Sequence, residues 1–224
     1  AQKGSSEAAR ISRLVVPSQN TYSIILSDGT KVVLNANSEL EFAETFSSAN
    51  REVTLKGEGY FEVTKDPSKA FIVHANGVNV RVYGTKFNIN GFEKENITTF
   101  LLEGSVSVST DDSAPVRMKP MQVAKNNIVT KQQIVTNVTN ADKYLSWMSN
   151  NFIFHATPVS EVVTMIENWY GIRFAELSKE CRETLVSGGF SRSTKLGEML
   201  IAIQNSINGK IYYENNQYHI NLNQ

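Results

Sequence analysis

This sequence has a single cysteine, no excess of positive charge and no long apolar run. Cys181 is the one cysteine, so no disulfide can form within the chain and cysteine usage does not indicate a compartment. Basic and acidic side chains balance at 22 each, whereas a nucleic-acid binder would carry a basic stripe. No apolar run approaches the roughly 20 residues that cross a bilayer. Residues 1–13 are polar and have no signal-peptide core, so we expect any targeting segment to be absent from this sequence.

The pattern that is present divides the chain into two unlike parts. From residue 14 to 138 apolar residues alternate with period two, which predicts an all-β domain. From 144 to 222 strand patterns alternate with two amphipathic helices, and a polar, Asn-rich stretch separates the two parts. We therefore predict an α+β protein. Its N-terminal all-β domain is an irregular β-solenoid or sandwich-like, and a small βαβ-βαββ domain follows.

A hairpin is expected at the start of the first domain, around Asp28–Gly29–Thr30. A two-residue turn would mix the apolar and polar faces of its strands, whereas an odd connection keeps the apolar sets together. We predict a three-residue loop with Gly29 or Thr30 strained, and we expect Leu26 to pair with Val32.

Glycines interrupt the apolar faces of later strands. Gly57 and Gly59 lie on the apolar face of one strand, which predicts a bend or the close approach of another backbone. Between Val82 and Phe87 the alternation slips by one residue, so we predict a β-bulge near Gly84. Mid-strand glycines recur along this domain, a pattern that a solenoid or a sandwich would both satisfy.

The second domain begins with a predicted strand at 151–155. Thr157 is a good helix N-cap, Pro158 a good first helical residue and Gly171 a good C-terminal residue, so we expect a helix between them. A return strand is expected at 172–177.

A second unit of the same kind follows. It is predicted to start with a strand at 184–190 and to continue with a helix capped by Ser193 or Thr194. A terminal hairpin then turns at Asn215–Asn216.

Two glutamates and a glycine pair are the first candidates for chemistry. The Gly-x-Gly at 57–59 lacks the third glycine and the following helix of a dinucleotide-binding loop. Glu58 and Glu62 share a strand face, but four strand residues separate their Cα atoms by roughly 13 Å, too far for a retaining glycosidase. We interpret the two carboxylates as a solvated strand face.

The remaining reactive side chains are scattered. His74, His155 and His219 have no second ligand at metal spacing, and Cys181 has no neighbouring histidine, which indicates a partly buried inert thiol. Leu185 stands where a nucleophile elbow needs its first glycine. We predict no catalytic residue, no cofactor and no metal.

Tyrosines near the C-terminus are candidates for partner docking. Tyr212, Tyr213 and Tyr218 lie on two adjoining strands, and alternation turns at least one of Tyr212 and Tyr213 away from the core. An exposed tyrosine beside an edge strand suits a protein interface. The alternative is an ordinary sheet face with one ring in water.

Four glycine-bearing strand motifs follow one another between residues 26 and 108. Their members, in order, are Leu26, Asp28, Gly29, Val32, Leu34 and Asn35; Leu55, Gly57, Glu58, Phe61, Glu62, Val63, Asp66 and Pro67; Val82, Gly84, Thr85, Phe87 and Asn88; and Leu101, Glu103, Gly104, Val106 and Val108. Together they resemble the periplasmic region of FecR-family anti-sigma factors. The second half, with its aromatic run from Trp147 and the helix pattern at 158–171, is similar to the short N-terminal domain of secretins and TonB-dependent receptors.

The resemblance implies a periplasmic sensor module of an inner-membrane protein. Its partner would be the signalling domain of a TonB-dependent outer-membrane receptor, and its output the release of an extracytoplasmic-function sigma factor. The sigma factor would be reached only through a cytoplasmic segment, which this sequence lacks together with the membrane segment. Such a protein is not an enzyme and binds neither nucleic acid nor a small-molecule substrate.

A β-rich carbohydrate-binding protein is the alternative that the residues leave open. It would need a groove with clustered exposed aromatic rings. The first domain offers Tyr22, Tyr60 and Tyr83 for that purpose.

Overall fold

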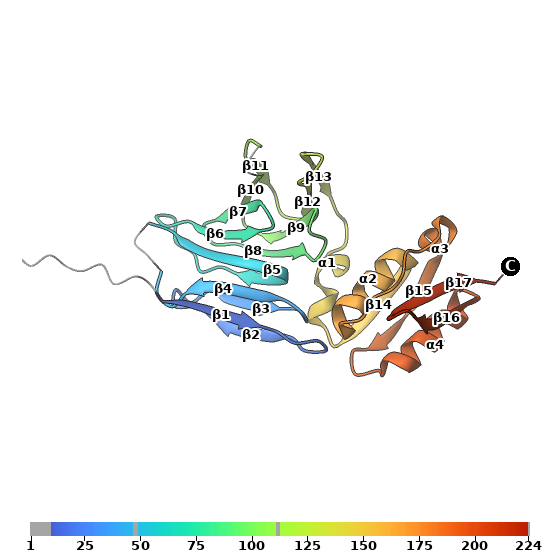
Figure 1. Cartoon of the computed structure of the whole chain (residues 1–224). Helices are drawn as coiled ribbons and strands as arrows, with labels where there is room; N and C mark the ends of the chain where they lie inside the picture. Colours follow the sequence, from blue (N-terminus) through green and yellow to red (C-terminus); the bar gives the residue numbers. More distant parts are fainter. Residues whose placement is uncertain (1–9, 47–48, 111–112, 224) are drawn as a thin grey trace, which may run out of the picture. The chain divides into compact units, whose positions relative to one another are not determined.

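The computed structural model describes residues 10–46, 49–110 and 113–223 and is mostly β, with a small α/β part (Figure 1). The polar start at residues 1–9, on which the expectation about targeting rests, lies outside the described residues. The chain forms two compact units. The first unit holds the described chain up to Val16 together with Thr21–Tyr144, and the second holds Pro17–Asn20 and the chain from Leu145 onward.

Thirteen strands, joined in one continuous network of pairings, make up the described part of the first unit. They are β1 (Ile11–Val15), β2 (Tyr22–Ile25), β3 (Lys31–Leu34), β4 (Glu39–Ala43), β5 (Arg51–Glu62), β6 (Phe71–Ala75), β7 (Val78–Val82), β8 (Lys86–Gly91), β9 (Asn96–Glu103), β10 (Val106–Thr110), β11 (Val116–Met118), β12 (Gln122–Asn127) and β13 (Gln132–Asn137).

The long strand β5 belongs to two rows of strands at once (Figure 1). Its first half pairs with β4 and β6, and its second half pairs with β3 and β8. Gly57 lies where β5 passes from the first pair of neighbours to the second. Its φ is 87°, and a Cβ there would lie 2.9 Å from the Cα of Ser38. The close backbone approach predicted for this strand is therefore confirmed. Between the described strands of this unit only β5 and β6 pair in parallel, so the glycines do not mark the parallel coils of a solenoid.

The core of the first unit consists of the alternate apolar residues that the period-two pattern predicts. Phe61 and Phe87, on neighbouring strands, stack with ring centres 5.1 Å apart, and both are fully buried. Phe71 packs against Phe61 from β6. Burial of such rings contributes about 1.5–3 kcal/mol each to folding.

The first hairpin has a loop of the predicted three residues, but it lies at 27–29, one residue before the predicted position, with Gly29 at a φ of 83°. The Leu26 N–H donates to the carbonyl of Thr30, so Leu26 lies opposite Thr30 and the predicted pairing with Val32 is wrong. The predicted register is therefore shifted by two residues. The apolar residues still share one face, because side chains alternate with period two.

The predicted bulge at Gly84 is also wrong. Strand β7 ends at Val82 and β8 begins at Lys86, and Gly84 lies in the connection with a φ of 142°. The phase slip marks a change of strand, because β7 pairs with β6 and β10 whereas β8 pairs with β5 and β9. A register irregularity does occur on β9, where Leu102 is left over between the residues that face Lys86 and Phe87.

The described part of the second unit contains three α-helices, two of them long, and two antiparallel strand pairs. Its elements are β14 (Asn151–Pro158), α2 (Val159–Tyr170), α3 (Lys179–Glu183), β15 (Leu185–Ser191), α4 (Leu196–Ser206), β16 (Gly209–Glu214) and β17 (Gln217–Leu222). The short α1 (Asp142–Leu145) and a 3₁₀ turn (Ser146–Met148) precede β14.

The βαβ connectivity predicted for this unit is not observed, because β14 pairs with β15 antiparallel. The expected return strand at 172–177 is reduced to one bridge between Phe174 and Tyr218, and α3 follows it. Two backbone hydrogen bonds hold this bridge, from Ala175 and from Tyr218. So short a contact does not propagate into a strand.

The helix ends differ from the prediction mainly at their starts. Pro158 is the N-cap of α2 and Lys195 that of α4, and neither cap makes a side-chain hydrogen bond. Thr157 instead accepts a hydrogen bond from the His155 N–H. The predicted stop at Gly171 is confirmed, since its φ of 69° is left-handed. The turn at 215–216 is confirmed as well, because both asparagines have positive φ.

Candidate functional site

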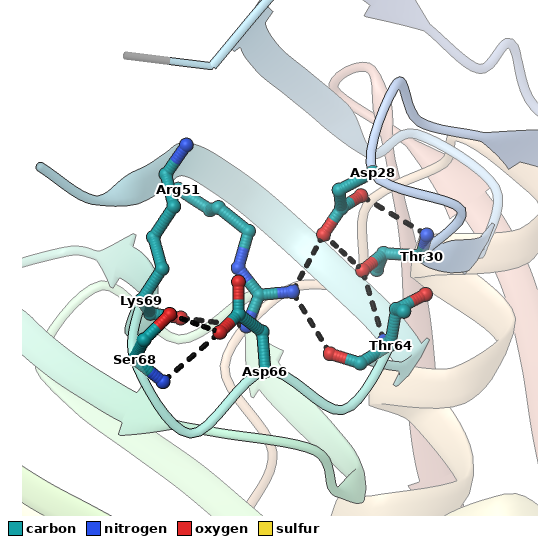
Figure 2. Close-up of polar contacts among 7 residues, drawn as sticks. All are labelled: Asp28, Thr30, Arg51, Thr64, Asp66, Ser68 and Lys69. Atoms are coloured by element: carbon teal, nitrogen blue, oxygen red, sulfur yellow. Dashed lines mark hydrogen bonds and ion pairs between the residues drawn. The ribbon is translucent and has the colours of Figure 1, made fainter. Parts of the chain in front are cut away.

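A buried arginine organises the first polar cluster (Figure 2). Arg51 begins β5 and is 2% exposed. Its guanidinium donates to the Asp28 carboxylate and to the carbonyls of Thr64 and Lys69, each at 2.8 Å. The Asp28 carboxylate also accepts from the N–H and the hydroxyl of Thr30. This cluster ties the first hairpin to the end of β5, so its role is to stabilise the fold.

Asp66 closes the loop beside this cluster. Its carboxylate accepts from the Ser68 hydroxyl at 2.7 Å and from the Ser68 N–H at 2.9 Å (Figure 2). These hydrogen bonds hold the pKa of Asp66 below its ordinary value. The Asp-Pro of the second sequence motif therefore shapes a turn.

A second polar cluster surrounds Glu58. The carboxylate accepts from the side-chain amides of Asn35 at 2.9 Å and Asn88 at 3.0 Å, and the Glu58 N–H donates to the Ser38 hydroxyl. Glu58 is only 6% exposed, so the predicted solvated face is wrong for this residue. It faces inward because β5 crosses between rows of strands at Gly57.

These clusters bring together the polar members of three different sequence motifs. Asp28 and Asn35 come from the first, Glu58 and Asp66 from the second, and Asn88 from the third. Alternation could not reveal the convergence, since it depends on which strands are neighbours. The available signal was a polar residue beside a glycine in an otherwise apolar strand.

The other reactive side chains stay apart. No group of three or more histidine, cysteine, aspartate or glutamate residues in the described part of the chain could hold a metal. His74 contacts Asn79 and Glu52, and His219 stacks on Tyr212. Cys181 is buried, and burial raises the pKa of its thiol.

Aromatic rings gather at the tip of the β16–β17 hairpin. Tyr213 and Tyr218 lie opposite each other with ring centres 4.9 Å apart, and Phe174 continues the row 5.6 Å from Tyr218. Tyr213 is 59% exposed, whereas Ile220 on the same face is buried. This face of the hairpin is therefore buried at Ile220 and exposed to solvent at the hairpin tip. We call Phe174, Tyr213 and Tyr218 the aromatic tip.

Tyr212 lies on the opposite face of the hairpin. Its ring stacks on His219 at 5.2 Å, and its hydroxyl accepts from the Asn221 side chain. Alternation therefore places the three candidate tyrosines on both faces, with Tyr213 the most exposed.

The rings proposed for a carbohydrate groove do not gather in the first unit. Tyr60 is 5% exposed, and only Tyr22 and Tyr83 of the three are exposed. A shallow hollow of about 380 Å³ on this unit is lined by apolar side chains, among them Ile11, Phe42 and Phe46, and by polar ones, but by none of the three tyrosines.

No helix among residues 10–46, 49–110 and 113–223 is long and apolar enough to cross a membrane.

Comparison with known families defines the chain as a signalling protein. The family model described as FecR protein matches residues 12–107, and the one described as FecR, C-terminal matches residues 151–220. The chain belongs to the FecR family of anti-sigma factors, a regulatory and non-enzymatic class.

Solved structures agree with this assignment. Two crystal structures of a candidate anti-sigma factor from Parabacteroides distasonis superpose with TM-scores of 0.79 and 0.80. Both are 25% identical in sequence, and the matches cover 96% and 95% of this chain and 100% of the other. No curated protein matches the chain.

Proposed function

We propose that this chain is the periplasmic sensing part of an inner-membrane anti-sigma factor. It docks on the signalling domain of a substrate-loaded TonB-dependent outer-membrane receptor. Docking exposes the parent protein to regulated proteolysis and releases an extracytoplasmic-function sigma factor, which a cytoplasmic segment outside this sequence would hold. The two domains of this module correspond to residues 14–138 and 144–222.

The aromatic tip is the observation that carries the docking proposal. Tyr213 exposes more than half of its surface beside two half-buried rings. Interface hot spots are enriched in tyrosine and gain most when a ring inserts into a partner's pocket. The first unit supports the assignment by contrast, because its motif residues Asp28, Glu58 and Asn88 are engaged in hydrogen bonds within the fold.

The proposal assigns most of the docking energy to the second unit. Most apolar residues of its two long helices pack inward, among them Val162 and Ile166 of α2 and Ile203 of α4, whereas Ile201 of α4 is exposed. The hairpin tip and the strand edges remain accessible to a partner. Tyr213 is the expected anchor, with Tyr218 and Tyr212 in supporting positions.

Titration of the receptor's signalling domain into the full chain tests this proposal. Tyr213→Ala should cost about 1–3 kcal/mol of binding free energy, because the anchor ring is lost. Tyr83→Ala is the matched control, since Tyr83 is an exposed tyrosine of the first unit and should leave affinity unchanged. Circular dichroism of both variants should match the parent chain. Undiminished binding by Tyr213→Ala, Tyr218→Ala and Tyr212→Ala would rule out the aromatic tip, and full-strength binding by residues 14–138 would rule out the second unit.

A further inference from the structure

The outer edge of β16 presents main-chain hydrogen-bonding groups. Among the described residues β16 pairs with β17 only. The Ile211 N–H donates to Gln204 Oε1 of α4 at 2.8 Å, so the main chain of Ile211 points away from β17. Hydrogen-bonding directions alternate along an antiparallel strand, which turns the main chain of Tyr213 to the same side. The two-residue turn at 215–216 agrees, because it leaves Glu214 to bond with Gln217 across the hairpin.

Two opposite charges frame this edge. Lys210 and Glu214 lie two residues before and after Tyr212, on the face of the hairpin that carries Tyr212. Both are exposed, and neither takes part in an ion pair in the described part of the chain. Their cross-strand neighbours, Asn221 and Gln217, are uncharged.

This edge is complementary to itself. When two β16 strands run antiparallel with Tyr212 opposite Tyr212, each Lys210 lies opposite the Glu214 of the other copy. The same register places Ile211 opposite Tyr213, and these are the two residues whose main-chain groups face outward. A shift of four residues in relative register, in either direction, places Lys210 opposite Lys210 or Glu214 opposite Glu214, which is unfavourable.

We propose that two copies of this chain pair through their β16 edges, antiparallel about a two-fold axis at Tyr212. The partner of this edge is therefore a second copy of the chain. In the monomer Gln204 Oε1 takes the position that the Tyr213 carbonyl of the second copy occupies in the dimer. Because pairing must displace Gln204, the dimer is weak and depends on concentration. This pairing does not depend on the docking proposed above.

Sedimentation equilibrium of the full chain over a range of concentrations tests the charge pairing. Lys210→Glu and Glu214→Lys should each weaken the dimer about tenfold, because two attractive pairs become repulsive. The double variant K210E/E214K exchanges the charges and should restore the dimer. Lys179→Glu, on α3 of the same unit, is the matched control and should leave it unchanged.

A second pair of variants tests the main-chain contact. Tyr213→Pro removes the outward N–H and Tyr213→Ala keeps it, while both remove the ring. Tyr213→Pro should weaken the dimer more than Tyr213→Ala, with circular dichroism unchanged. A monomer at all concentrations, or a double charge variant no better than the singles, would overturn the proposal. Weaker binding of the receptor's signalling domain by K210E and E214K, with no dimer in the parent chain, would also overturn it and assign the edge to that partner.

Discussion

Replacing Arg51 should selectively destabilise the first unit. The side chain is 2% exposed and makes three hydrogen bonds of 2.8 Å, one of them to the Asp28 carboxylate. Arg51→Met keeps much of the apolar stem but leaves a carboxylate and two carbonyls without their donor. Breaking a buried ion pair in this way costs about 3–5 kcal/mol. Since a domain is stable by only about 5–15 kcal/mol, the loss is a large fraction of its stability.

The position of the tryptophans makes the assay selective. The chain has two, Trp147 and Trp169, and both belong to the second unit. In a guanidinium titration tryptophan fluorescence therefore reports the second unit, whereas far-ultraviolet circular dichroism includes the many strands of the first. Arg51→Met should move the circular dichroism transition to lower denaturant and leave the fluorescence transition in place.

Two companion variants sharpen the interpretation. Lys56→Met removes the exposed partner of Glu39 and should cost at most about 1 kcal/mol, as surface ion pairs do. Asp28→Asn keeps an acceptor for Arg51 and should cost less than Arg51→Met. A loss below about 1 kcal/mol for Arg51→Met would refute the stabilising role of the cluster. A parallel shift of both transitions would instead show that the two units unfold together.

Three further predictions concern individual features of the two units. Gly84→Val should destabilise the first unit by about 1–3 kcal/mol, because φ at Gly84 is 142° and a Cβ there would lie 2.7 Å from the Cα of Lys65. A thermal melt equal to that of the parent chain would show that the glycine is incidental. Residues 145–224 should fold alone with a cooperative melt. They should be about 1 kcal/mol less stable than the second unit in the full chain, because the Gln19 N–H that donates to the Trp169 carbonyl is missing. Aggregation or a non-cooperative melt would contradict this. The Cys181 thiol should react with Ellman's reagent at pH 8 far more slowly in the folded chain than in denaturant. Burial shields the thiol from the reagent and raises its pKa, so that little thiolate forms. Equal rates would show that the thiol is accessible.

Local chemistry accounts for the features that could be predicted from residue order. Alternation predicted the core of the first unit, because a strand sends successive side chains to opposite faces whatever its neighbours are. Gly57, Gly171 and the pair Asn215–Asn216 were recognisable for the same reason, since each backbone conformation is nearly closed to other residues. The exposed tyrosine of the terminal hairpin also follows, because two adjacent tyrosines on a strand face opposite ways.

Tertiary structure decided how strands become neighbours, and with it the environment of the polar motif residues. The glycines on either side of Glu58 mark it as unusual, but they do not show that it is buried between two asparagines, because that depends on which strands lie beside it. The antiparallel pairing of β14 with β15, and the reduction of 172–177 to one bridge, depend on contacts between segments far apart in the chain. Sequence alone thus determined most strands of the first unit, the turn at 215–216 and the helix stop at Gly171 of this FecR-family chain. Long-range packing decided the buried clusters at Arg51 and Glu58, and it decided that Tyr213 rather than Tyr212 is the more exposed ring, because burial depends on which segments meet.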